Sequence, residues 1–295
     1  MQARLLKADG LLLLTALIWG AAFVAQRVGM EHVGPFTFNA VRFALGSLAL
    51  QPLIWYMQRT RAREGGGSGI NGLRLMRCGM LAGAVLFAGA ALQQVGMVYT
   101  TAGKAGFITG LYVVMVPLFG LALRQKAGLG TWVGVAAAAV GLYLLSVNED
   151  FTIAFGDILE IIGAVFWAGH VLLIGRLSPG MDSTDAVKLA STQFSMCALL
   201  SMLAAGTTET ITMGGISGAA IPILYGGLMS VGVAYTLQVV AQRDANPAHA
   251  AIILSMEAVF AAVAGYFILG EMLSMRALVG CGLMLAGMLV SQLRP

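Results

Sequence analysis

The chain has 295 residues, of which 59% are hydrophobic and 10% are charged, and its mean hydropathy is +0.87. So little polar surface cannot cover a soluble globule of this length, and the composition therefore excludes a soluble fold and favours a bilayer protein. The net charge of +4 could suggest a nucleic-acid partner, but most basic residues lie in short connections between apolar stretches. We interpret them as topology signals and expect no nucleic acid to bind.

Apolar stretches recur along the whole chain. A transmembrane helix needs about 20 apolar residues to cross roughly 30 Å of hydrocarbon. The sequence predicts an all-α integral membrane protein with ten such helices, at residues 10–30, 36–57, 77–99, 103–123, 128–146, 156–176, 185–205, 217–240, 247–269 and 274–292. The first stretch follows a basic start, as a signal peptide would, but it is too long and lacks a small-residue cleavage site, so we interpret it as a span.

The basic residues are distributed unequally between the two sides of this arrangement. With the N-terminus in the cytoplasm, thirteen lysines and arginines fall on the inner side and three, Arg27, Lys104 and Arg276, on the outer side. Short cytoplasmic connections carry the excess of basic residues in membrane proteins. We therefore predict a multi-pass protein of the inner, or plasma, membrane with both termini cytoplasmic.

The second half of the chain repeats the first. At a single offset of 145 residues, 105–108 aligns with 250–253, Gly110 with Ser255, Gly120 with Gly265 and Lys126 with Glu271. Near the start of each half, Trp19 aligns with Trp167. An ordered series of matches indicates duplication, and we predict a five-helix repeat at 1–147 and another at 148–295. Because an odd number of helices reverses the second repeat, the repeats are inverted, as in many secondary transporters.

Three sequence motifs point to a known family. They are TALIWG at 15–20, AGKAGFITGLY at 102–112 with Pro117, and LSMEAVF at 254–260 with LGE at 269–271. Together they resemble the EamA branch of the drug/metabolite transporter superfamily, over essentially the whole chain. The resemblance implies a ten-helix inner-membrane exporter or importer of small metabolites, often amino acids, with a central cavity and alternating access. It implies no particular substrate.

Several aromatic and polar side chains fall within the predicted spans, where a solute cavity would lie. Trp19 and Trp167 are near the middle of their helices and are related by the repeat, so we expect them to face each other at the axis, although they could simply fill the core. His170 shares a helix face with Trp167, three residues earlier, and could titrate or serve as a core donor. The candidates for substrate binding are Trp19, Gln94, Tyr112, Trp167, His170, Tyr235 and Glu257.

Glu257 lies about ten residues into the ninth span, some 15 Å deep, where an ionised carboxylate is costly unless it is paired or hydrated. One interpretation makes it a proton site or the counter-charge of a cationic substrate. The other is a structural pair with Arg42, which lies well inside the second span and could otherwise extend toward the surface. Tyr112 aligns with Glu257 at the offset of 145 residues, so both side chains are expected near the axis.

Two further features of the spans have weaker functional interpretations. Lys104 and His249 correspond in the two repeats and lie at helix starts, so they are gate candidates or merely solvated helix ends. Glycines in the fifth and tenth spans suit close packing within the bundle or a homodimer contact. The cysteines Cys78, Cys197 and Cys281 lie in apolar stretches without metal-ligand spacing, so we expect no disulfide, metal or cofactor.

The sequence thus favours a transporter, with a small-molecule solute and the lipid bilayer as its partners, over two other functions. An intramembrane lipid-modifying enzyme would need catalytic side chains clustered at one membrane face, which the scattered Asp157, Glu160 and His170 do not provide. A non-transporting membrane scaffold would not need polar groups at mid-depth. No catalytic residues are predicted, and no nucleotide-binding motif indicates coupling to ATP.

Overall fold

The computed structural model describes residues 2–63, 70–99, 102–125, 127–146, 155–264, 266–267 and 274–293, and every regular element in these ranges is a helix. The first half contains α1 (Gln2–Gly29), α2 (Pro35–Arg63), α3 (Gly72–Tyr99), α4 (Ala102–Gly110), α5 (Tyr112–Ala122) and α6 (Leu129–Ser146). The second half contains α7 (Phe155–Leu177), α8 (Ser183–Thr208), α9 (Met213–Gly218), α10 (Ala220–Leu224), the π-helix η1 (Tyr225–Tyr235), α11 (Thr236–Ala241), α12 (Pro247–Leu254), α13 (Glu257–Ala264) and α14 (Met275–Leu293).

Each predicted span coincides with a helix or with a stack of shorter helices. Among the described residues, seven helical stretches are long and apolar enough to cross a membrane, and two shorter apolar ones are Leu129–Leu144 and Met275–Ser291. The remaining predicted span is α2, which is 29 residues long but interrupted by polar side chains. Large apolar side chains such as Leu48, Leu129 and Ile221 are exposed on the outside of the bundle, as is expected where lipid replaces water. The prediction of an all-α membrane protein is confirmed.

Three spans that we expected to be continuous are broken. The span at 103–123 divides into α4 and α5 at Leu111, and the span at 247–269 divides into α12 and α13 at 255–256. The two breaks correspond at the offset of 145 residues, and the same tightened hydrogen bond marks both: Leu111 N–H donates to Ile108 O, and Met256 N–H donates to Ile253 O, each at 3.1 Å. The third interrupted span, at 217–240, includes η1. Broken helices and π-helices commonly mark functional sites.

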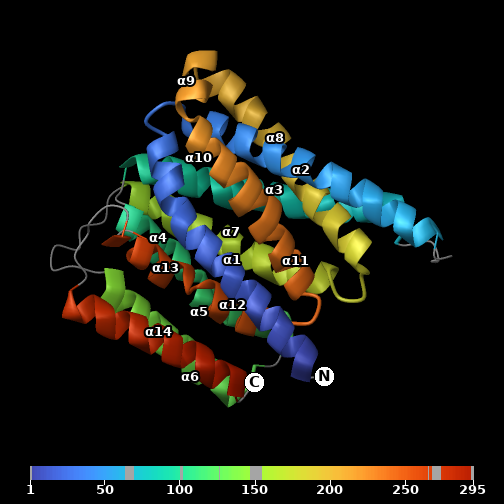
Figure 1. Cartoon of the computed structure of the whole chain (residues 1–295). Helices are drawn as coiled ribbons and strands as arrows, with labels where there is room; N and C mark the ends of the chain where they lie inside the picture. Colours follow the sequence, from blue (N-terminus) through green and yellow to red (C-terminus); the bar gives the residue numbers. More distant parts are fainter. Residues whose placement is uncertain are drawn as a thin grey trace.

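Corresponding helices of the two halves pack in a reciprocal pattern. α2 packs against α8, and α6 packs against α14 (Figure 1). α3 packs against α7 and α8, whereas η1 packs against α1 and α2 in the equivalent way. Such an exchange of partners is what an approximate two-fold relation between the halves produces. The boundary at 147/148 lies outside the described residues, so the division into 1–147 and 148–295 stays a prediction.

The two termini of the described chain lie at the same end of the bundle. His249, near the start of α12, contacts Asp9 of α1 and Ser291 of α14 through its two ring nitrogens, at 3.0 and 2.7 Å. Figure 1 shows the beginning of α1 and the end of α14 at this common end. Termini on one side are expected for an even number of crossings.

Glycines allow α6 and α14 to pack closely. A Cβ at Gly134 would lie 2.7 Å from Gly287 O, and a Cβ at Gly287 would lie 2.7 Å from Gly134 O. Gly141 meets Gly280 O in the same manner, at 2.5 Å. These four glycines therefore pack the two helices of one chain against each other, as one of the two interpretations expected.

Substituting alanine at Gly287 is expected to destabilise the protein by about 1–3 kcal/mol, because the added methyl group has no room against α6. Gly282→Ala on the same helix is the matched control, since nothing lies within 4 Å of a Cβ at that position. Thermal unfolding in detergent compares the two variants. Equal stabilities for both would contradict the close α6–α14 contact.

Candidate functional site

A polar cavity lies at the centre of the bundle, lined by side chains from both halves of the chain. Its walls surround about 490 Å³ of space that is not occupied by atoms, part of which is open solvent. The lining residues are Trp19, Ala22, Phe23, Gln26, Arg42, Gln93, Thr109, Tyr112, Trp167, Val171, Ser230, Tyr235, Gln238, Leu254 and Glu257. The two broken helices both contribute, through Thr109 and Tyr112 on one and Leu254 and Glu257 on the other.

Three aromatic rings form one wall of the cavity. The ring of Tyr235, at the end of η1, lies 4.5 Å from that of Trp19 and stacks on that of Trp167 at 6.2 Å, measured between centroids. The indole N–H of Trp19 donates to the carbonyl of Ser230 at 3.2 Å, which fixes the orientation of its ring. The two tryptophans related by the repeat therefore both line the cavity, with Tyr235 as the ring that each contacts.

Arg42 supplies a positive charge at one side of the cavity. Its side chain on α2 is only 2% exposed, and its Nε donates to the Oδ1 of Asn39 at 2.9 Å. The guanidinium also lies over the rings of Phe43 and Phe38, at 4.9 and 5.5 Å from their centroids. Asn39 in turn donates to the carbonyl of Ala90 on α3 at 3.1 Å. Arg42 is thus held by neutral partners, and its terminal nitrogens are directed to the cavity.

Glu257 supplies a carboxylate at the other side. It is the first residue of α13, directly after the break, and Tyr112 is the first residue of α5 at the equivalent break. The hydroxyl of Tyr112 donates to Glu257 Oε1 at 3.2 Å. The structure therefore brings together the two residues that the repeat related, and it does so through the helix breaks, which turn both side chains toward the axis.

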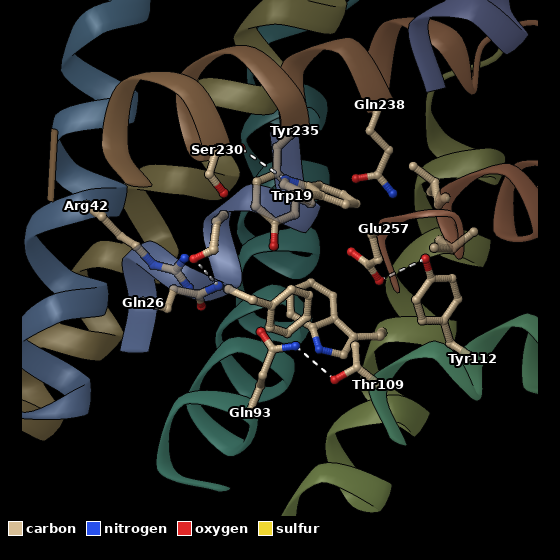
Figure 2. A pocket seen from close by; sticks show the side chains of 15 residues that line it. Trp19, Gln26, Arg42, Gln93, Thr109, Tyr112, Ser230, Tyr235, Gln238 and Glu257 are labelled. Carbon is tan, nitrogen blue, oxygen red and sulfur yellow. Dashed lines mark hydrogen bonds between the residues drawn. The ribbon is translucent and has the colours of Figure 1, made fainter. Parts of the chain in front are cut away.

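Arg42 and Glu257 do not form the ion pair that one interpretation expected. Both line the cavity, but no ion pair within 4.0 Å involves either of them among the described residues. Figure 2 shows Arg42 beside Gln26 at one side and Glu257 beside Gln238 and Tyr112 at the other, with the rings of Trp19 and Tyr235 between them. Their helices hold the two charges too far apart for direct contact, and Arg42 does not extend to the surface either.

Buried polar atoms without partners add to the polar character of the cavity. The indole N–H of Trp167 and the side-chain oxygens of Gln26 and Gln238 are buried and have no hydrogen-bond partner among the described residues. Buried polar groups are nearly always satisfied. A solute with its own donors and acceptors would satisfy these three.

Two predicted cavity residues lie behind the lining. Gln94 is fully buried but does not line the cavity, whereas its neighbour Gln93 does. Successive helical residues point about 100° apart, so the two side chains face different surroundings. A role of Gln94 in substrate binding stays a prediction. His170 hydrogen-bonds Gln193 at 2.9 Å and packs edge-on against Trp167 and Tyr235. It therefore supports the aromatic wall from outside the cavity.

Of the two gate candidates, the structure describes the side chain of His249 but not that of Lys104. His249 does not line the cavity but joins Asp9 and Ser291 at the end of the bundle that carries both termini. The side chain of Lys104 lies outside the described residues. Their suggested roles as gates stay predictions.

Sequence reasoning missed part of the lining. It did not select five polar residues that line the cavity, namely Gln26, Gln93, Thr109, Ser230 and Gln238. One signal was available, because Gln26 follows Trp19 by seven residues and so shares its helix face. Among the described residues, no group of three or more His, Cys, Asp or Glu side chains could hold a metal ion.

A bundle of apolar helices that encloses a polar cavity, lined from both halves and at broken helices, defines a membrane transporter. Two consecutive segments, residues 6–147 and 154–292, match the model of the EamA-like transporter family, and the chain belongs to that family. The resemblance seen in the sequence motifs is thereby confirmed.

Similar proteins carry transporter names. An uncharacterized transporter of Archaeoglobus fulgidus is 32% identical over 290 residues, covering 98% of this chain and 87% of that protein. The uncharacterized inner membrane transporter YedA of Escherichia coli is 27% identical, covering 92% and 86%. One crystal structure superposes with a TM-score of 0.78 at 16% identity, covering 97% of this chain and 96% of that one, and shows the shared fold. The chain is thus a multi-pass membrane protein of the EamA-like transporter family.

Proposed function

We propose that the protein is a secondary transporter, working in the direction of export, for small zwitterionic metabolites such as amino acids. The observation that carries this proposal is the placement of Arg42 and Glu257 at opposite sides of one cavity, each without an ion-pair partner among the described residues (Figure 2). A solute with a carboxylate at one end and an ammonium group at the other would complement both.

The energetics of buried charge support a zwitterion over a neutral solute. A buried charge costs several kcal/mol unless it is paired and hydrogen-bonded. The Arg42 guanidinium can bind a carboxylate through two parallel hydrogen bonds, and Glu257 can accept hydrogen bonds from an ammonium group. Trp19, Trp167 and Tyr235 then offer an apolar surface to the remainder of the solute. Alternating access of the two halves around this cavity would move the solute across the bilayer.

Counterflow in proteoliposomes tests this function. Vesicles loaded with an unlabelled neutral amino acid and diluted into the same labelled compound should accumulate label. The decarboxylated amine and the deaminated acid should each compete much less well than the amino acid. Equal competition by all three, or transport of neutral solutes only, would contradict the proposal. Export predicts in addition that overexpressing cells release the transported amino acid to the medium.

The excess of basic residues supports an orientation with both termini in the cytoplasm. Glu31, between α1 and α2, and Asp244, between α11 and α12, are both exposed and would then lie on opposite sides. We expect that, once the native cysteines are replaced, a thiol reagent that cannot cross the membrane will label a cysteine at position 31 from outside the cell. It should not label a cysteine at position 244. Labelling of position 244 from outside intact cells would reverse the orientation.

A further inference from the structure

A second carboxylate lies just beyond the cavity wall. Glu160 on α7 is fully buried and does not line the cavity. Its Oε2 accepts a hydrogen bond from the hydroxyl of Thr109 at 3.2 Å, whereas its Oε1 has no partner among the described residues. Gly96 of α3 leaves room for this carboxyl group, since a Cβ there would lie 2.9 Å from Oε1. Gly96 therefore leaves space for a buried carboxyl group in which only one of the two oxygens has a hydrogen-bond donor among the described residues.

A short chain of hydrogen bonds connects Glu160 to the cavity. Gln93 donates to the hydroxyl oxygen of Thr109 at 2.9 Å, and that hydroxyl donates to Glu160. Both Gln93 and Thr109 line the cavity (Figure 2). A solute that hydrogen-bonds to Gln93 or Thr109 therefore acts on the one hydroxyl that, among the described residues, donates to the buried carboxylate. These two hydrogen bonds connect the buried carboxylate to the cavity wall.

The described residues around Glu160 include no basic side chain that pairs with its carboxylate. Among the described residues, no lysine, arginine or histidine lies within 4.0 Å of it. The elements packed against α7 carry other titratable or charged groups, among them Tyr112 on α5, Tyr99 on α3, His249 on α12, and Lys104 on α4, whose side chain is outside the described residues. Asp157, His170 and Arg176 are on α7 itself, Arg74 and Arg77 are on α3, and Arg27 of α1 donates to Met97 O of α3. An ionised carboxylate with one hydrogen bond is strongly disfavoured at such a buried place.

We propose that Glu160 is a proton-binding site of the transporter, coupled to the solute cavity through Thr109 and Gln93, while Glu257 serves the solute itself. This inference rests on the proposed transport function. A proton from water forms the O–H bond on the free oxygen Oε1 and leaves by the reverse step, so no other reactant is needed. The chemistry requires only that water reaches Glu160 at one stage of the transport cycle.

Infrared difference spectroscopy of the purified full-length protein, between acid and alkaline pH, tests the site without any solute. The wild type should show a carboxylic acid C=O band that is absent from Glu160→Gln and retained in Glu257→Gln. In Thr109→Val, which keeps the carboxyl group but removes its donor, the band should persist at a shifted frequency. A Glu160→Gln spectrum identical to that of the wild type, or an unshifted band in Thr109→Val, would overturn the proposal.

Proteoliposomes containing the pH dye pyranine test the coupling. An amino-acid gradient should change the internal pH in vesicles of the wild type, and this change should fall to background in Glu160→Gln while amino-acid counterflow is retained. A pH change that survives in Glu160→Gln, or counterflow by the wild type without any pH change, contradicts the coupling. Absence of counterflow in the wild type would instead reject the proposed solute, and the infrared experiment would still decide whether Glu160 binds a proton.

Discussion

Replacing Arg42 with glutamine is expected to lower the affinity for zwitterionic solutes by about 30-fold or more, because removing one partner of a buried charge pair costs at least about 2 kcal/mol. The corresponding amines, which lack the carboxylate, should bind the variant as well as they bind the wild type. Competition counterflow with an amino acid and its decarboxylated amine measures both quantities. Zwitterion transport that is unchanged in Arg42→Gln would remove Arg42 from the binding site.

The stability of the same variant provides an independent control. Arg42 has no ion-pair partner among the described residues, so its replacement removes a buried charge without leaving another one unpaired. We therefore expect the thermal stability of Arg42→Gln without solute to equal or exceed that of the wild type, while stabilisation by added amino acid is lost. Arg42→Lys keeps the charge but lacks the two-pronged geometry, so it should bind zwitterions with intermediate affinity.

Replacing Glu257 with glutamine is expected to have the complementary effect. The affinity for zwitterions should again fall by about 30-fold or more, and the deaminated carboxylic acid should bind relatively better than it binds the wild type. Tyr112→Phe is the matched control, since it keeps the ring but removes the hydrogen bond to Glu257 Oε1. It should have a smaller effect on affinity, because the Glu257 carboxylate that would bind the ammonium group stays in place.

The double variant separates the two interpretations of Arg42 and Glu257. Since no ion pair within 4.0 Å joins them, the stability effects of the two single changes in the absence of solute should add to within about 0.5 kcal/mol. A structural pair would instead make each single change strongly destabilising and let the double change recover stability. Recovery of stability and flux together would restore the structural interpretation.

The sequence was sufficient to predict the helical membrane fold, because spans of about 20 apolar residues can hardly form anything else in a bilayer. It also related Tyr112 to Glu257 through the repeat. It did not predict that both helices break immediately before these residues. A break in the local backbone depends on packing between the halves. Gly110 precedes the first break, but Ser255 occupies the equivalent position before the second, so no residue type common to both signals them.

The cavity was predicted less completely than the fold. Residue depth along a span follows from counting, and Trp19, Trp167 and Glu257, which were selected by depth, line the cavity. The direction of a side chain around its helix depends on the packing partners, and Gln94 was chosen where Gln93 lines the cavity. The ion pair between Arg42 and Glu257 was one of two open interpretations and rested on charge alone, whereas the distance between two buried charges requires the tertiary structure.

An experimental structure with a bound neutral amino acid, chosen as the best solute in counterflow, tests the central claim most directly. We predict density for the ligand between the aromatic rings, with its carboxylate on the Arg42 guanidinium and its ammonium group at Glu257. The indole N–H of Trp167 and the side-chain oxygen of Gln238 should then each form a hydrogen bond with the ligand. A ligand bound elsewhere in the bundle, or one that contacts neither Arg42 nor Glu257, would contradict the account.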